Sequence, residues 1–148
     1  HKLWGMFPIR IFRYKVSFRT IRTHVLTDEE LPRDNYKKAL NMLFTAIRDA
    51  KCYVSHRYLG DANDFRITAL NSNGDASMGE SLKYKEQTKL YVQNPVSAES
   101  RLIYNGKQIG LSEGKNLEFN ISEPGIYRIE TYKDKKAWIF SNHIRIVA

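Results

Sequence analysis

Apolar and polar residues alternate through the last quarter of the chain, on both sides of the polar stretch 133–136. A period of two is typical of half-buried strands, because successive side chains of a strand point to opposite faces. The two alternating runs, 126–132 and 137–146, therefore predict strands that are joined by a hairpin turn.

The region 51–148 contains further short apolar stretches, separated by turn residues. Asn105-Gly106 is the strongest turn signal, because a two-residue hairpin needs positive φ at both central positions. The stretches 71–74, 112–114 and 124–125 are also rich in turn residues. The predicted strands are Cys52–His56, Phe65–Leu70, Thr88–Gln93, Arg101–Tyr104, Leu117–Ile121, Ile126–Tyr132, Trp138–Phe140 and His143–Val147. Short strands at this spacing over about 100 residues predict a β-sandwich of the immunoglobulin type.

The sandwich predicts which apolar side chains are buried. We expect the core to include Ile103, Leu117, Ile126, Ile129, Trp138 and Phe140. Ile126 and Ile129 fall on opposite faces of a regular strand, so burial of both predicts a bulge or twist near residues 127–128.

A helical period replaces the alternation between residues 27 and 50. Pro32 and Asp34 mark the beginning of the predicted helix, because the Asp34 side chain can cap the amide groups of the first turn. Apolar residues then recur at steps of four, three, four and three, namely Tyr36, Leu40, Leu43, Ile47 and Ala50. They share one face, so we expect the helix to lie with this face on an apolar surface.

The first 26 residues are basic, aromatic and apolar. The spacing of Val16, Phe18, Ile21 and Val25 favours a short helix after an extended arm, whereas their β-branched members would equally allow a strand. The predicted architecture is mainly β, with a basic arm and helices in residues 1–50 and the immunoglobulin-like sandwich in residues 51–148.

The composition fits a folded chain that needs no disulfide. Of the 148 residues, 42% are hydrophobic and 12% are aromatic, which is not typical of disorder. The single cysteine, Cys52, cannot form an internal disulfide. No apolar run approaches the ~20 residues that a membrane-spanning helix needs, so no membrane partner is predicted. The start of the sequence shows no signal peptide, and the compartment stays open.

The net charge of +8 is concentrated near the start of the sequence. Six basic residues precede the first acidic residue, Asp28, and 18 basic and 16 acidic residues follow from there. Arg10, Arg13 and Lys15, interleaved with aromatic residues, would suit a nucleic-acid backbone with stacked bases. No known nucleic-acid-binding motif is present, so nucleic acid is not the partner that we expect.

Several pieces carry a family resemblance: Phe12–Tyr14, Ser17–Thr20, Thr23–Leu26, Ala50–Ser55, Ala76–Glu80, Arg101–Lys107 and Pro124–Ile146. In this order and spacing they resemble the C-terminal region of metal-dependent phosphoesterases of the polymerase and histidinol phosphatase (PHP) superfamily. The resemblance implies a non-catalytic C-terminal region that packs on or assists the catalytic PHP domain of the same parent chain. Residues 1–50 would then contain the end of that catalytic domain.

In that superfamily, histidines and carboxylates hold divalent ions such as manganese, zinc or iron, from a His-x-His pair to a closing Asp-x-His pair. This chain has no His-x-His pair. His1 is the candidate metal ligand, as the last residue of the closing pair, and could equally be a cloning remnant. One imidazole cannot hold an ion that activates water, so we predict no cofactor in this chain and no enzymatic activity for it alone. Arg19 and Arg22 are candidate phosphate contacts in the parent enzyme, and His24 is interpreted as a hydrogen-bonded, partly buried residue.

Two other functions stay open: a carbohydrate- or protein-binding sandwich, and a basic nucleic-acid-binding domain. A sugar groove could use Trp4, Tyr58, Tyr104 and Tyr127, although aromatic residues also fill the cores of such sheets. Apolar side chains within residues 1–15 also predict a weak, salt-sensitive self-association.

Overall fold

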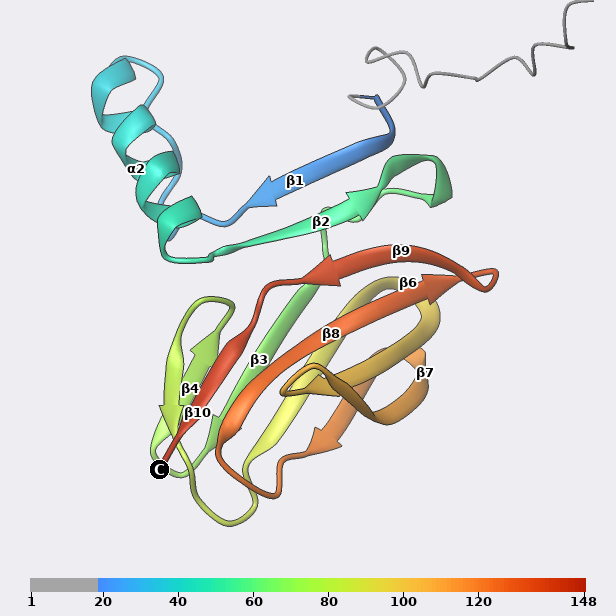
Figure 1. Ribbon diagram of the computed structural model, residues 1–148. Helices are drawn as coiled ribbons and strands as arrows, with labels where there is room; N and C mark the ends of the chain where they lie inside the picture. Colours follow the sequence, from blue (N-terminus) through green and yellow to red (C-terminus); the bar gives the residue numbers. More distant parts are fainter. Residues whose placement is uncertain (1–18) are drawn as a thin grey trace, which may run out of the picture.

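The computed structural model describes residues 19–148, and its architecture is mainly β (Figure 1). Its elements are β1 (Ile21–Val25), α2 (Tyr36–Arg48), β2 (Cys52–His56), the 3-10 turn η1 (Arg57–Leu59), β3 (Arg66–Asn71), β4 (Gly74–Ser77), β5 (Ser81–Lys83), β6 (Lys89–Tyr104), β7 (Lys107–Asn120), β8 (Gly125–Lys133), β9 (Lys136–Ser141) and β10 (Ile144–Val147). The bounds of β2 are those predicted from the sequence. Strands β1, β4 and β5 were not predicted.

The ten strands form one curled sheet in the order β1-β2-β9-β8-β6-β3-β4, with β7 beside β6 and with β10 beside both β8 and β5. All pairs are antiparallel except β5 and β10. The long strand β6 causes the curl, because its first half pairs with β3 and its second half pairs with β8. A register irregularity between Gln93 and Ala98 separates the two halves. The sequence pattern predicts two strands here, Thr88–Gln93 and Arg101–Tyr104, where the structure has the single strand β6.

The core lies between the two halves of the curled sheet. Ile67 of β3, Leu90 of β6 and Ile129 of β8 are at most 1% exposed and belong to one buried cluster. Each such side chain contributes about 1.5–3 kcal/mol when it is fully removed from water. Ile103 and Trp138 are also buried, as predicted, whereas Leu117 is only partly buried.

The predicted burial of Ile126 and Phe140 is wrong, because these side chains are 45% and 37% exposed. Strand β8 alternates regularly from Ile126 to Thr131, with Tyr127 and Ile129 inward and Ile126 outward. The pairing of β8 with β6 runs without interruption through residues 127–128, so the expected bulge is absent there. The irregularity of β8 lies between Thr131 and Tyr132 instead, where it pairs with β9.

A buried polar cluster stabilises the bend of β6. Asn94, Ser100 and Thr131 are each 0% exposed. The Asn94 amide donates to the Ser100 hydroxyl at 3.0 Å and to the Gly114 carbonyl at 2.9 Å, and Thr131 donates to the Asn94 carbonyl oxygen at 3.2 Å. Because these groups satisfy one another, the bend buries polar atoms without leaving them unpaired.

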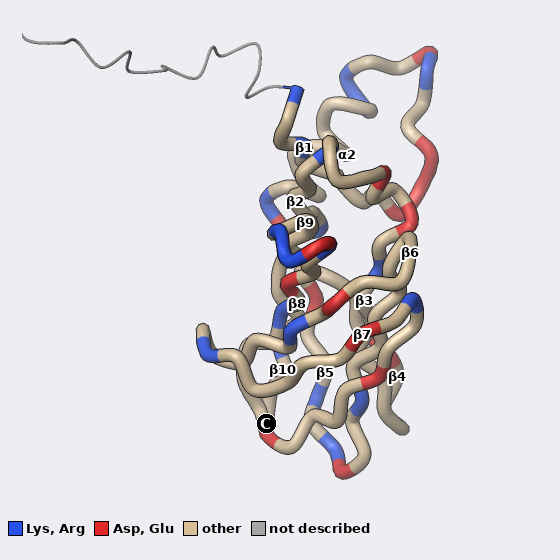
Figure 2. The backbone as a smooth tube through the Cα atoms, turned by 90° about the vertical axis from the view of Figure 1, so that its right-hand side faces the viewer, with Lys and Arg blue, Asp and Glu red and all other residues tan. Residues whose placement is uncertain are grey.

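The strand β1 and the helix α2 form an arm at the end of the molecule opposite to the C-terminus (Figures 1 and 2). The short helix expected across residues 16–25 is wrong for Ile21–Val25, which form a strand. This strand gains backbone hydrogen bonds from β2, and β-branched side chains favour the extended conformation. Helix α2 begins after Asn35, whose side chain accepts from the Lys38 amide at 3.0 Å, so Asn35 and not Asp34 is the cap.

Candidate functional site

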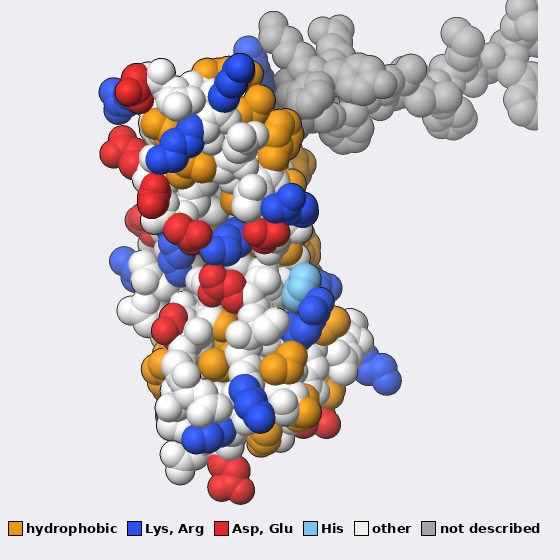
Figure 3. Space-filling view, turned by 90° about the vertical axis from the view of Figure 1, so that its left-hand side faces the viewer, with side chains coloured by type: hydrophobic (Ala, Val, Ile, Leu, Met, Phe, Trp, Pro, Cys, Tyr) orange, Lys and Arg blue, Asp and Glu red, His pale blue; other side chains and the backbone are white. Residues whose placement is uncertain are grey.

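Helix α2 presents an uncovered apolar face, which we call the α2 stripe. It consists of Tyr36, Leu40, Phe44 and Ile47. The side chains of Tyr36, Phe44 and Ile47 are 76%, 61% and 49% exposed. The face predicted from the sequence is covered only in part, since Tyr36 and Ile47 are exposed whereas Leu40, Leu43 and Ala50 are partly buried. The fully buried residue of α2 is Ala46, which the prediction did not include. Figure 3 shows apolar side chains gathered at this end of the molecule among basic and acidic ones.

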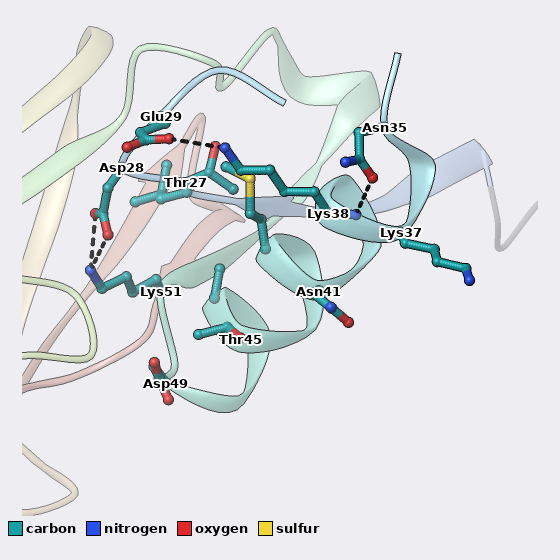
Figure 4. A pocket seen from close by; sticks show the side chains of 13 residues that line it. Thr27, Asp28, Glu29, Asn35, Lys37, Lys38, Asn41, Thr45, Asp49 and Lys51 are labelled. Carbon is teal, nitrogen blue, oxygen red and sulfur yellow. Dashed lines mark hydrogen bonds and ion pairs between the residues drawn. The ribbon is translucent and has the colours of Figure 1, made fainter. Parts of the chain in front are cut away.

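A groove of about 670 Å³ lies on another side of α2, between the helix and the segment that follows β1. Leu26, Met42 and Ala46 contribute its apolar wall. The labelled polar side chains of Figure 4 surround this wall. Helix α2 is thus open to solvent on two sides.

Most of the charged side chains around this groove form ion pairs. Lys51 Nζ lies 3.0 Å from Asp28 Oδ1 and 3.1 Å from Glu80 Oε1 (Figure 4). The hydrogen bond to Asp28, followed by the bond to Glu80, raises the pKa of Lys51. Glu29 and Lys38 form a looser pair at 3.9 Å. Lys51 therefore fastens the segment after β1 to the turn between β4 and β5, and so positions the arm on the sheet.

A second, polar pocket of about 360 Å³ lies beside β1, and we call it the β1 pocket. Strand pairing positions its wall, because Arg22 of β1 lies opposite Ser55 of β2 in the ladder. The turn η1 and the following loop supply Arg57, Asp61 and Asn63 to its lining. The pocket thus combines residues from two strands and one loop.

His24 occupies the inner side of the β1 pocket. Its Nε2 lies 2.8 Å from the Ser55 hydroxyl, and its ring stacks on the buried ring of Tyr53. Burial lowers the pKa of His24, and the negative charge of Asp61 opposes this effect. The interpretation of His24 as a hydrogen-bonded, partly buried residue is confirmed.

The positive charges of the β1 pocket have no carboxylate partner within residues 19–148. Neither the Arg22 nor the Arg57 guanidinium forms an ion pair or a hydrogen bond there. The one carboxylate of the lining, Asp61, accepts from the backbone and side-chain amides of Asn63, both at 3.2 Å. Two guanidinium groups therefore remain available to a ligand.

The structure separates the two arginines that were predicted as phosphate contacts. Arg22 lines the β1 pocket, whereas Arg19 is exposed and does not line it. Ser55, Arg57 and Asn63 were missed, because they are distant in sequence from Arg22 and only the pairing of β1 with β2 brings them close. No local sequence signal could have shown this.

The predicted metal ligand His1 lies outside the described residues. Within residues 19–148, no group of three His, Cys, Asp or Glu side chains could hold a metal ion. The proposed sugar-binding aromatic residues do not share a groove, because Tyr58 is 68% exposed while Tyr127 is fully buried in the core. Trp4 also lies outside the described part.

Comparisons with known proteins give no match to any protein-family model, curated protein or solved structure. No helix among residues 19–148 is long and apolar enough to cross a membrane.

Proposed function

We propose that this chain is the non-catalytic C-terminal region of a metal-dependent phosphoesterase of the PHP type. Its role in this proposal is to pack on the catalytic domain through the α2 stripe. The observation that carries the proposal is the open apolar face of α2, and the ordered sequence resemblance supports the choice of partner.

The α2 stripe needs a partner for a physical reason. A 13-residue helix is marginally stable by itself, and packing of its apolar face supplies most of the stability of such a helix in proteins. Full burial of a side chain as large as Phe44 or Ile47 contributes about 1.5–3 kcal/mol. A folded domain that covered the stripe would gain this free energy at several adjacent positions.

The polar flanks of the stripe suit a folded protein partner. Lys37 and Arg48 are exposed on α2, and the Lys51 pairs hold the base of the arm on the sheet. An apolar centre with a charged rim is the usual anatomy of a protein interface. In this proposal the curled sheet is an immunoglobulin-like sandwich, which holds the arm in a fixed orientation.

The same proposal assigns different roles to the catalytic domain and to the present chain. Divalent metal ions such as manganese, zinc or iron, and the ligands that hold them, belong to the catalytic domain. The present chain contributes an apolar surface and a fixed orientation. Its one predicted metal ligand, His1, would reach that site.

The first test is to determine the coding sequence immediately upstream of His1. We expect an aspartate two residues before His1 and a His-x-His pair further upstream, in the same reading frame. A frame that lacks both, or a vector-derived tag directly before His1, would argue against the family assignment.

The second test uses the protein encoded by that frame. Replacing both Phe44 and Ile47 with aspartate should increase amide hydrogen exchange in α2 and lower the unfolding temperature, because the stripe would lose its cover. Ile109→Asp is the matched control, since Ile109 is 52% exposed on β7, far from α2. Equal protection of α2 in the double variant and the control would contradict packing through this face.

A further inference from the structure

We propose that the β1 pocket binds the phosphoryl group of a small phosphate monoester, with Arg22 and Arg57 as its charge partners. The proposal concerns a different surface from the α2 stripe and does not rest on the packing role.

The charge of the pocket favours an anion. Arg22 and Arg57 line it without an ion pair among the described residues, and Asp61 is held by two hydrogen bonds from Asn63. Arg66 adds positive potential nearby, since its charge disfavours protonation of His24. Two guanidinium groups and one carboxylate thus line the pocket, and Arg66 adds positive charge from outside it.

The geometry favours a phosphoryl group over a carboxylate. A carboxylate is planar and is satisfied by one guanidinium fork, whereas a phosphate monoester offers three terminal oxygens in different directions. Arg22 approaches from β1 and Arg57 from η1, and the Ser55 hydroxyl and the His24 imidazole line the same pocket. Donors from several directions match a tetrahedral group.

The size and accessibility of the pocket are compatible with such a ligand. Its volume of about 360 Å³ accommodates a phosphoryl group with a small organic substituent. Arg22 and Arg57 are both exposed, so a ligand can reach them from solvent. Ser55 is 3% exposed and is held by His24, so it is suited to orient the ligand and not to act as a nucleophile.

The test is a titration of the isotope-labelled chain, followed by amide NMR, with inorganic phosphate and glycerol 3-phosphate as probes. We expect saturable shifts at the amides of residues 55–63. Acetate at equal concentration and ionic strength should shift them less, because it cannot engage both arginines. Shifts that do not saturate, or an equal response to acetate, would overturn the proposal.

Variants identify the residues responsible. Arg22→Gln and Arg57→Gln should each weaken phosphate binding by about 10-fold or more, as expected for loss of a charge-assisted hydrogen bond. Arg33→Gln is the matched control, because Arg33 is exposed outside the pocket. Spectra of the unliganded variants show whether the fold is retained, which we expect for exposed side chains. Binding that survives the Arg22→Gln, Arg57→Gln double variant would overturn the assignment.

The two proposals can fail separately. Aspartate at Phe44 and Ile47 should leave phosphate binding unchanged, while the arginine variants should leave the protection of α2 unchanged. Loss of phosphate binding in the α2 variant would contradict the independence of the two surfaces.

Discussion

The imidazole of His24 lies flat on the phenol ring of Tyr53, with centroids 4.4 Å apart and ring planes within 3°. Tyr53 is 2% exposed and donates its hydroxyl hydrogen to the Ala62 carbonyl oxygen at 2.5 Å. The stack therefore joins the edge strand β1 to the loop that closes the β1 pocket. Protonation of His24 should consequently affect both the pocket and the attachment of the arm.

The stability of the protein should fall when the pH falls through 6.5, the usual pKa of histidine. Burial lowers the pKa of His24 in the folded state, so the unfolded state binds the proton more readily. The stability that neutral His24 contributes is fully present above pH 6.5. It is lost as the pH falls from 6.5 to the lowered pKa of His24 in the folded state. Urea unfolding at several pH values measures it. His24→Gln should reduce the pH dependence of the free energy of unfolding relative to the unsubstituted protein, and an equal pH dependence in the two proteins would contradict the prediction.

Two neighbouring isoleucines of β8 should differ strongly in their effect on stability. Ile129 is 0% exposed whereas Ile126 is 45% exposed. Ile129→Ala should lower the free energy of unfolding by about 2–5 kcal/mol, because it leaves a cavity in the core. Ile126→Ala should lower the free energy of unfolding by clearly less, because the Ile126 side chain is about half exposed to solvent. Denaturant unfolding of the two variants gives the comparison, and similar losses would contradict the observed face of β8.

Asn94 should be important for stability although it is polar. Asn94→Ala removes the partner of Ser100, Thr131 and the Gly114 carbonyl within a buried cluster. Buried polar groups without partners cost about 1–3 kcal/mol each, so we expect a loss in that range or above it. Asn116→Ala serves as the control on an exposed position of β7. A variant at Asn94 that unfolds at the same urea concentration as the control would disprove the role of the cluster.

The end of α2 should be sensitive to Gly79. A Cβ atom at Gly79 would lie 1.9 Å from the carbonyl oxygen of Asp49, which is the C-cap residue of α2. Gly79→Ala should therefore destabilise the protein by more than about 1 kcal/mol and increase hydrogen exchange in α2. Gly106→Ala is a close control, because Gly106 has the same φ of +85° and no atom within 4 Å of the added methyl group. Equal effects of the two substitutions would show that backbone strain alone is responsible.

Local patterns predicted the elements that local interactions determine. The alternation in residues 126–132 and the turn at Asn105-Gly106 correspond to β8 and to the connection of β6 with β7. The start of α2 was placed close to its cap, because capping depends on neighbouring residues. Such features need no knowledge of distant parts of the chain.

The remaining features depend on pairing over long distances. Ile21–Val25 is a strand because β2 offers it hydrogen bonds, and its own residues allowed either conformation. The same pairing brings Arg22 beside Arg57 and thus creates the β1 pocket. The exposure of Ile126 follows from the alternation of β8, in which Tyr127 and Ile129 occupy the buried face, and hydrophobicity alone could not indicate this. The resemblance to PHP phosphoesterases stays a prediction.

The parallel pairing of β5 with β10 has a consequence for how the chain folds. It joins Ser81 to Arg145 and Leu82 to Ile146, which lie far apart in sequence, whereas the β6–β7 and β8–β9 hairpins join neighbouring segments. Contacts between distant segments carry a larger loop-closure entropy and form slowly. The hairpins should therefore assemble early in refolding, and the docking of β10 between β5 and β8 should be a late step that completes the core around Ile144.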